Sequence, residues 1–300
     1  MLYRDNRQER RGILMAETKY GNYVKQLAFQ QGRGGTNAKE LTFVSGEDMG
    51  GFELNFIIGV YDTVGDWAPD AGAHNHAFDE LILFFGYDDG DLGYLGSDMA
   101  LSLGREYETH RFSVPLVGVA PRGFPHCPLV TEKVYKPFGH FHLALSATYA
   151  GERVPREGET DGTKYAHLMK PLKVQKGVGG ADAVQFIQVN GDELEGMNIN
   201  FNLGLFNRAG RWDPGHGAHV HPYDEAYVFF GHNTDDLSYL GAEITMEIGK
   251  EHEKHTFDKP TVVAIPRGVP HLPVTCNSLE RPYSVMQVGL GLMYECSEVD

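Results

Sequence analysis

Residues 74–86 read H-N-H-A-F-D-E-L-I-L-F-F-G, and residues 219–231 read H-V-H-P-Y-D-E-A-Y-V-F-F-G. Each stretch has two histidines one residue apart, then a glutamate, and then a run of large apolar residues that ends at glycine. Alternate residues of a strand point to the same side, so each histidine pair projects together. On a straight strand, however, the glutamate would lie roughly 13 Å beyond the second histidine. Pro222, Asp79 and Asp224 fit a turn that would bring it back.

A helical zinc motif is the alternative interpretation of the first stretch, because His76 and Glu80 would lie one helical turn apart. Pro222 at the matching place of the second stretch, and the aromatic run after it, argue against a helix. We therefore expect strands on either side of a turn.

The two stretches belong to a longer repeat at an offset of 145 residues, which begins at Tyr20 with Tyr165 and continues to Pro137 with Pro282. Such regularity indicates an internal duplication and two copies of one domain. We divide the chain into an N-terminal arm (1–19), a first barrel (20–145), a linker (146–164) and a second barrel (165–300).

Short runs rich in β-branched and aromatic residues, bounded by Gly, Pro or Asp, predict strands in both copies. In the first copy they cover 52–60, 81–85 and 114–119, and in the second 197–206, 226–230 and 261–265. Many short strands with closely spaced turns are typical of a sandwich or barrel. The expected fold class is therefore all-β, with two barrels packed together.

The composition is that of a folded globular protein, with 41% apolar and 22% charged residues among 300. The formal net charge of −15 argues against a nucleic-acid partner. Three cysteines without paired spacing indicate a reducing compartment. The charged N-terminus lacks a signal-peptide core, and no apolar run is long enough to span a membrane. We expect a cytoplasmic protein that does not associate with membranes.

A second motif follows about forty residues later in each copy: P-R-G-F-P-H over 121–126 and P-R-G-V-P-H over 266–271. Its Pro-x-Gly piece predicts a tight turn before a histidine that opens the next strand. Three imidazoles and one carboxylate together suit a divalent first-row metal ion.

H-x-H-x-x-x-E followed by P-x-G-x-x-H resembles the paired motifs of the cupin superfamily, and the duplicated chain resembles a bicupin over most of residues 20–290. The resemblance implies two double-stranded β-helix (jelly-roll) barrels, each with a metal inside. The implied ligands are His74, His76, Glu80 and His126 in the first barrel, and His219, His221, Glu225 and His271 in the second. One departure is that five residues, rather than six, separate the glutamate from the next glycine. Such a set leaves two octahedral positions open, so we favour Mn²⁺, then Fe²⁺, then Zn²⁺.

The copies differ at one later strand, where the first has His140 and His142 and the second has Val285 and Gln287. Alternation places both histidines on one face. The resemblance would turn that face into the barrel, where either histidine could act as a general base or hold substrate. A polar strand face at the contact between the domains is the competing interpretation.

Several polar residues outside the two ligand sets also have expected roles or positions. Arg122 and Arg267 either bind a substrate carboxylate or form surface ion pairs. We expect Cys127 to point away from the metal. The pattern Glu106-x-Glu108-x-His110, which recurs at 251–255, predicts a solvated outer face, and His216 is an additional histidine of the second copy.

Two open positions on a divalent ion suit a small chelating oxygen ligand such as a 1,3-diketone, an α-keto acid or a catechol-like diol. The chain also resembles bicupins of anaerobic polyphenol breakdown, of the dihydrophloroglucinol cyclohydrolase type. That likeness implies hydrolytic C–C ring opening of a cyclic 1,3-diketone. An Fe²⁺ ring-cleaving or diketone-cleaving dioxygenase is the first alternative, and a non-catalytic small-molecule-binding bicupin the second. Isomerase and decarboxylase activities also stay open. The expected partners are a small-molecule substrate and further copies in a homo-oligomer.

Overall fold

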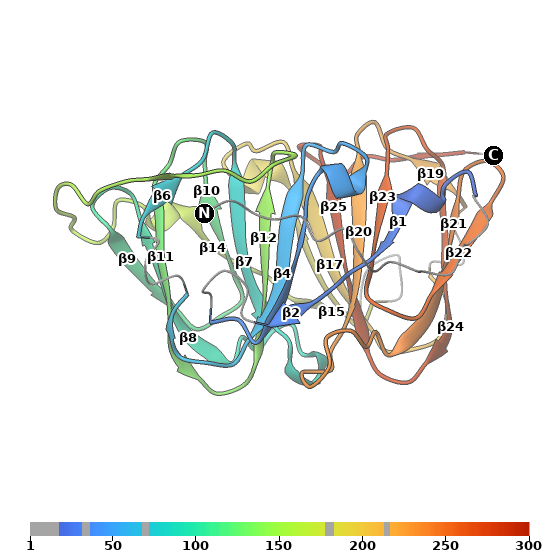
Figure 1. Cartoon of the computed structure of the whole chain (residues 1–300), viewed down its shortest axis with the longest axis horizontal. Helices are drawn as coiled ribbons and strands as arrows, with labels where there is room; N and C mark the ends of the chain where they lie inside the picture. Colours follow the sequence, from blue (N-terminus) through green and yellow to red (C-terminus); the bar gives the residue numbers. More distant parts are fainter. Residues whose placement is uncertain (1–17, 32–36, 68–71, 178–182, 213–216, 300) are drawn as a thin grey trace, which may run out of the picture.

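Two β-barrels lie side by side in the computed structural model (Figure 1). The structure describes residues 18–31, 37–67, 72–177, 183–212 and 217–299. Most of the N-terminal arm and His216 therefore lie outside the described residues. Short 3₁₀ helices connect the strands: η1 (Gly21–Tyr23), η3 (Glu47–Met49), η4 (Asp88–Gly90), η5 (Ala166–Leu168) and η6 (Gly191–Glu193). Among the described residues, no helix has the length and apolar character needed to cross a membrane.

The first barrel is built from two antiparallel sheets. One sheet has the order β14 (Met169–Pro171), β10 (Leu116–Ala120), β7 (Glu80–Gly86), β12 (Phe138–Ala144), β4 (Asn55–Tyr61), β3 (Glu40–Val44) and β2 (Gln30–Gln31). The other has the order β13 (Glu152–Arg153), β6 (His74–Asn75), β11 (His126–Val134), β8 (Ser97–Leu103) and β9 (Glu108–Phe112), with β5 (Gly65–Asp66) also paired to β11.

The second barrel repeats this plan. Its first sheet has the order β1 (Val24–Gln26), β23 (Thr261–Ile265), β20 (Glu225–Gly231), β25 (Tyr283–Gly289), β17 (Asn200–Phe206), β16 (Gln185–Val189) and β15 (Gln175–Lys176). Its other sheet has the order β22 (Glu253–Phe257), β21 (Ala242–Ile248), β24 (His271–Leu279), β19 (His219–Val220) and β26 (Ser297–Glu298), with β18 (Gly210–Arg211) paired to β24. The all-β prediction is confirmed, and most predicted strands differ from the observed ones only at their ends.

The apolar runs of the two opening stretches form β7 and β20, and every residue of both strands is buried. They are continuous rather than alternating because one face lines a barrel and the other packs against the neighbouring barrel. Phe85 and Phe141 of the first barrel thus lie 5.9 and 5.6 Å from Phe230 of the second, measured between ring centroids. The glycine that ends the first run is also required, since a Cβ on Gly86 would lie 1.9 Å from the carbonyl oxygen of Asp91.

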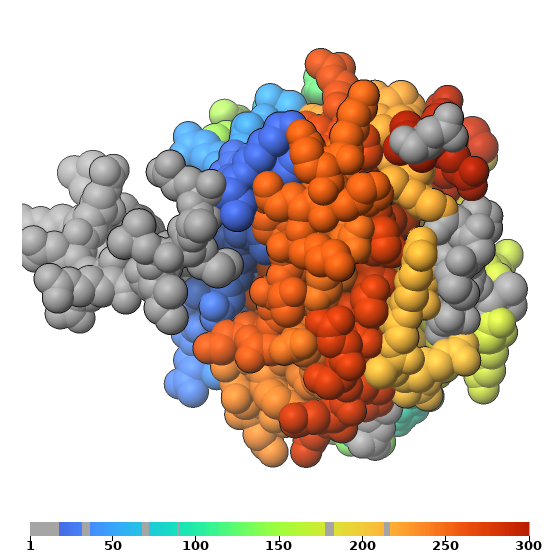
Figure 2. Space-filling model, turned by 90° about the vertical axis from the view of Figure 1, so that its right-hand side faces the viewer, coloured from blue at the N-terminus to red at the C-terminus, as the bar shows by residue number. Residues whose placement is uncertain are grey.

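The barrels exchange their first strands. Strand β1, near the N-terminus, pairs with β23 of the second barrel, whereas β14, from the start of the second repeat, pairs with β10 of the first. Figure 2 shows the blue N-terminal segment against the orange strands of the second half. Strands β1 and β14 therefore each join the barrel opposite to the one in which we had placed their residues, 20–145 and 165–300. The repeat identifies equivalent residues, but it does not show which sheet edge each strand joins.

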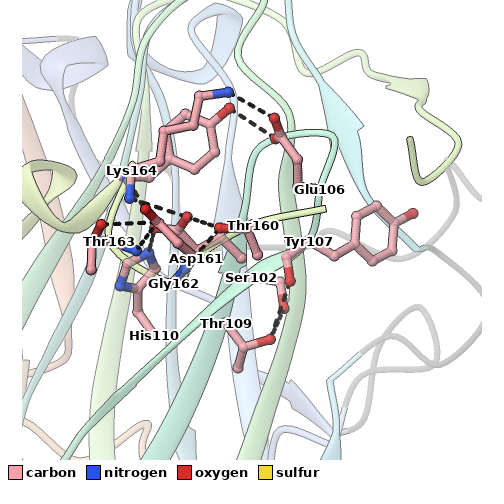
Figure 3. A network of polar contacts seen from close by, with 12 residues as sticks. Ser102, Glu106, Tyr107, Thr109, His110, Thr160, Asp161, Gly162, Thr163 and Lys164 are labelled. Atoms are coloured by element: carbon pink, nitrogen blue, oxygen red, sulfur yellow. Dashed lines mark hydrogen bonds and ion pairs between the residues drawn. The ribbon is translucent and has the colours of Figure 1, made fainter. Parts of the chain in front are cut away.

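The carboxylate of Glu108 binds the exchanged segment to the first barrel, on a strand face that we expected to be solvated. Glu108 is fully buried and accepts hydrogen bonds from the backbone amides of Tyr165 (2.8 Å) and Lys164 (3.2 Å) and from the Thr160 hydroxyl. Figure 3 shows Thr160 and Lys164 of this segment, with the Lys164 side chain bonded to Glu106. Its counterpart Glu253 accepts the Tyr20 amide at 3.1 Å. The prediction was wrong because the strand's outer face is covered by a segment distant in sequence.

Residues predicted to form a linker instead follow the surface of the first barrel. Strand β13 pairs with β6, and the amide of Val154 donates to the carbonyl of Ala73 at 2.8 Å. Farther along, the Glu157 amide donates to the Arg105 carbonyl at 2.9 Å. This segment is thus part of the first barrel's wall and reaches its histidine cluster.

Candidate metal centres

In the first barrel, three strands bring the predicted ligands together. His74 lies on β6 opposite His126 at the start of β11, and a bend at 77–78 allows Glu80 to begin β7 beside them. Oε2 of Glu80 lies 2.8 Å from Nε2 of His76 and 3.4 Å from Nε2 of His126. The turn that we expected before the glutamate is therefore present, and the helical alternative is wrong.

The second barrel repeats the arrangement with its own four residues. The ligand nitrogens of His219, His221 and His271 lie within 4.8 Å of one another. Oε2 of Glu225 lies 3.2 Å from Nε2 of His221 and 3.1 Å from Nε2 of His271. The structure thus brings together the members of both predicted ligand sets.

Backbone carbonyls orient the imidazoles. Nδ1 of His76 faces the Ala150 carbonyl at 2.6 Å, and Nδ1 of His221 faces the Glu295 carbonyl at 2.6 Å. A carbonyl only accepts, so each Nδ1 carries a proton and each Nε2 is turned toward the glutamate of its cluster. Such partners fix the tautomer and ring orientation of metal-binding histidines.

The clusters contain polar atoms that the protein itself leaves without hydrogen bonds. Oε2 of Glu80, Nε2 of His126, Oε2 of Glu225 and Nε2 of His271 are buried and make no hydrogen bond within the described residues. Each such atom costs about 1–3 kcal/mol when nothing satisfies it. A cation at the centre of each cluster would bind the two unsatisfied atoms of that cluster. The residues present therefore fit a divalent metal ion.

The protonation states also suit metal ligands. Burial alone would raise the pKa of Glu80, but His142 and His126 hold it well below its ordinary value, so the carboxylate stays ionised. Burial lowers the pKa of His74 to about 4, which keeps this imidazole neutral. Anionic carboxylate and neutral imidazole are the forms that bind metals.

The aspartate before each glutamate positions the second motif. Oδ1 of Asp79 accepts the Arg122 amide at 2.7 Å, and Oδ1 of Asp224 accepts the Arg267 amide at 2.9 Å. Both arginine side chains are exposed. They do not line the cavity described below, which argues against their binding a substrate there.

A cavity of about 170 Å³ opens beside the first cluster. Its lining consists of Leu41, Ile57, Tyr61, Trp67, Gly72, His74, Glu80, Ile82, Cys127, Pro128, Leu129, His140, His142 and Tyr149. His140 and His142 therefore face the barrel interior, and the interpretation as a polar face between the domains is wrong. Nε2 of His142 contacts Oε1 of Glu80, the oxygen that faces away from the other histidines.

Cys127 points into this cavity, contrary to our expectation. Its Sγ lies within 4.8 Å of ligand nitrogens of His74 and His126. Strand alternation fails here because Cys127 has a left-handed backbone (φ 72°) and the pairing register shifts between His126 and Leu129. The corresponding residue of the second barrel is Leu272.

Tyr149 is a site residue that the sequence analysis missed. Its hydroxyl lies 3.3 Å from Nε2 of His76, and its ring lines the cavity. We had placed it in the linker. The 145-residue offset extends to Tyr294, whose ring lies 5.3 Å from that of His221, and this match was the available signal.

The second barrel carries bulkier and non-titrating residues where the first has its cavity. Tyr227 replaces Ile82 and is buried, with its ring 5.7 Å from that of His271. Gln287 replaces His142, and its Nε2 donates to Oε1 of Glu225 at 2.6 Å and to the Tyr227 hydroxyl at 3.2 Å. The two centres thus share their ligand sets but differ in the space and chemistry beside them.

Comparison with solved structures places this architecture. No protein-family model and no curated protein matches the chain. Structures of oxalate decarboxylase from Bacillus subtilis do: one from work on its Mn(II) centres gives a TM-score of 0.62 at 8% identity, covering 92% of this chain and 79% of that one. Another, of the enzyme at pH 4.6, gives 0.60 at 9% identity, with 92% and 78% covered. Identity this low establishes the fold alone. This protein therefore shares the two-barrel bicupin fold of those structures, with two jelly-roll barrels built by an internally duplicated chain.

Proposed function

We propose that this protein is a metal-dependent enzyme that opens a small cyclic 1,3-diketone by hydrolysing a C–C bond. The observation that carries the proposal is the cavity in the first barrel, which joins a three-histidine, one-carboxylate cluster to an additional histidine, His142. We therefore assign catalysis to the first barrel.

The proposed metal ligands are the four residues of each cluster. Manganese(II) is our first choice and iron(II) and zinc(II) follow, because three nitrogens and one oxygen leave room for a chelating ligand. When bound, such an ion supplies a Lewis acid that polarises a substrate carbonyl. The Mn(II) centres named for oxalate decarboxylase support this choice without deciding it.

His142 is the proposed proton carrier. Its Nε2 contacts Glu80, so a proton on that nitrogen leaves Nδ1 as the basic atom of the ring. The imidazole takes a proton from water as the hydroxyl adds to one ring carbonyl. The bond between that carbon and the carbon shared by both carbonyls then breaks, and the same proton passes to the departing carbon. One water is consumed, a carboxylic acid and a ketone result, and no oxidant is needed.

The lining favours a neutral ring over a small dianion. Among its described residues there is no lysine or arginine, and most side chains are aliphatic or aromatic. Oxalate, the substrate that gives oxalate decarboxylase its name, would have no cationic side chain to pair with here. The small volume suits a single six-membered ring rather than a drug-sized ligand. Dihydrophloroglucinol is such a cyclic 1,3-diketone, and we propose it as the substrate.

The test is metal analysis of the purified protein combined with turnover of dihydrophloroglucinol without oxygen. Two matched variants, His126→Ala and His271→Ala, each remove one ligand from one centre. We expect the protein to hold two equivalents of metal and each variant to lose one. Turnover should disappear in the first variant and persist in the second.

Three results would reject the proposal. Protein without stoichiometric transition metal would reject the metal centres. Ring cleavage that consumes O₂ and requires Fe²⁺ would identify a dioxygenase instead. Tight binding of the diketone by metal-loaded protein, with no ring opening in the presence or absence of oxygen, would identify a binding protein.

A further inference from the structure

The first-barrel cavity has a second polar group, farther from the glutamate than His142. Along β12, His142 pairs with Ile82 of β7, and His140 pairs with Phe84, two residues farther from Glu80. The ring centroids of the two histidines lie 6.4 Å apart, and both rings line the cavity. A molecule held at Glu80 and His142 therefore presents its opposite side to His140.

The protein fixes what His140 can offer a ligand. Its Nδ1 faces the Leu83 carbonyl at 2.8 Å, and because a carbonyl only accepts, Nδ1 carries the proton. Burial lowers the pKa of His140 to about 3, so the ring is neutral near pH 7. Its Nε2 is then a hydrogen-bond acceptor, and no protein group bonds to it among the described residues.

The surroundings do not supply the missing donor. The Trp67 ring packs edge-to-face on His140 at 4.8 Å, but its N–H donates to the Thr131 hydroxyl at 2.7 Å. The ring of Tyr61 stacks on Trp67 with centroids 3.5 Å apart and also meets His140 edge-on, at 5.9 Å. An aromatic wall thus surrounds the neutral imidazole of His140.

The second barrel has apolar side chains at the corresponding positions. The residues equivalent to His140 and Tyr61 are Val285 and Phe206, and both are buried in its core. The same strand position is therefore compatible with an aliphatic side chain in this fold. His140 thus adds, at this position of the first barrel only, an acceptor that a ligand in the cavity can reach.

We infer that His140 is a specificity-determining residue that accepts a hydrogen bond from a hydroxyl on the far side of the substrate ring. This inference rests on the proposed function and narrows it. The ligand class is a six-membered ring with oxygens on two alternate carbons, which bind near Glu80, and a hydroxyl on the third alternate carbon, which binds His140. His142 thus transfers the proton, and His140 recognises the hydroxyl on the far side of the ring.

Two inert aromatic ligands test recognition without turnover. 1,3,5-Trihydroxybenzene carries the third hydroxyl and 1,3-dihydroxybenzene lacks it. Calorimetric titration of the manganese-loaded protein should show the first binding about 10- to 100-fold more tightly, the effect of satisfying one buried polar group. His140→Val, which copies the second barrel, should reduce this ratio to about threefold or less.

The control is internal, because affinity for 1,3-dihydroxybenzene and metal content should stay the same in His140→Val. The inference fails if the wild-type protein does not distinguish the ligands, if the variant keeps the preference, or if neither ligand binds. Binding with the expected preference, but no ring opening of dihydrophloroglucinol, would reject the proposed reaction and leave the recognition role intact. Efficient ring opening without any preference for the third hydroxyl would reject the recognition role of His140 and leave the proposed reaction intact.

Discussion

Replacing His142 by glutamine separates its two proposed roles, which are to hold the Glu80 carboxylate and to carry a proton. His142 contacts Oε1 of Glu80, and in the second barrel Gln287 bonds Oε1 of Glu225 at 2.6 Å from the same strand position. Glutamine is therefore compatible with holding the carboxylate. It has no titratable group near neutral pH, so it cannot carry a proton.

The magnitudes follow from these contacts. We expect His142→Gln to bind metal within about threefold of wild type, while turnover falls about 10²- to 10⁴-fold, the usual contribution of a general acid or base. His142→Leu removes the partner of a buried carboxylate oxygen. That loss costs about 1–3 kcal/mol, which agrees with the 10- to 100-fold drop in metal affinity typical of a lost ligand-orienting contact. Gln287→Leu should weaken the second centre by a similar factor.

Chelator competition gives the two metal affinities, and anaerobic product formation per metal-loaded first centre gives the rate. Gln287→Leu is the control, since its rate should stay near that of the wild type. A His142→Gln variant with wild-type turnover would refute the proton-transfer role. Unchanged metal affinity in His142→Leu would refute the idea that this contact orients Glu80.

Two further predictions concern stability. Glu108→Ala should lower the free energy of unfolding by about 3 kcal/mol in urea titrations, because it leaves several buried donors unpaired. The matched Glu253→Ala should cost less, since that carboxylate is 20% exposed; equal losses would contradict this account of the exchanged strands. Burial lowers the pKa of His232 from 6.5 to about 4, so the unfolded chain binds a proton that the folded chain refuses as the pH falls through this window. Stability should therefore decline between about pH 6.5 and 4 by up to about 3 kcal/mol from this group, and less steeply in His232→Gln; parallel pH profiles of the two proteins would show that the histidine is not responsible.

The strand exchange bears on how the two barrels stay together. Glu108 and Glu253 each bind the backbone at the start of the strand that the other repeat contributes. The barrels also share a continuous apolar contact that includes Phe85 and Phe230. We expect the two halves to unfold as one unit for this reason, so each ligand variant needs a stability measurement beside its metal analysis.

Some features were readable because they depend on local chemistry. The motif H-x-H-x-x-x-E, which occurs in both copies, pointed to imidazoles and carboxylates that meet in the structure, and the uninterrupted apolar run before Gly86 indicated a strand. Periodicity could not show whether His140 and His142 faced the barrel or the domain contact. The pairing register of β12 with its neighbours β4 and β7 decided that both histidines face the barrel interior.

By itself, then, the sequence determined the duplication and the all-β class, because both follow from residue type and spacing, and its resemblance to the cupin motifs named the two groups of four residues that the structure brings together. Only the tertiary structure decided that Cys127 and Tyr149 face the first cavity, that Glu108 is buried and that the first strands change places. Those outcomes depend on a left-handed residue, on a register shift and on which surface a distant segment covers. Contacts between residues far apart in the chain have no local signature, since the free energy that selects them is gained only when the whole barrel closes.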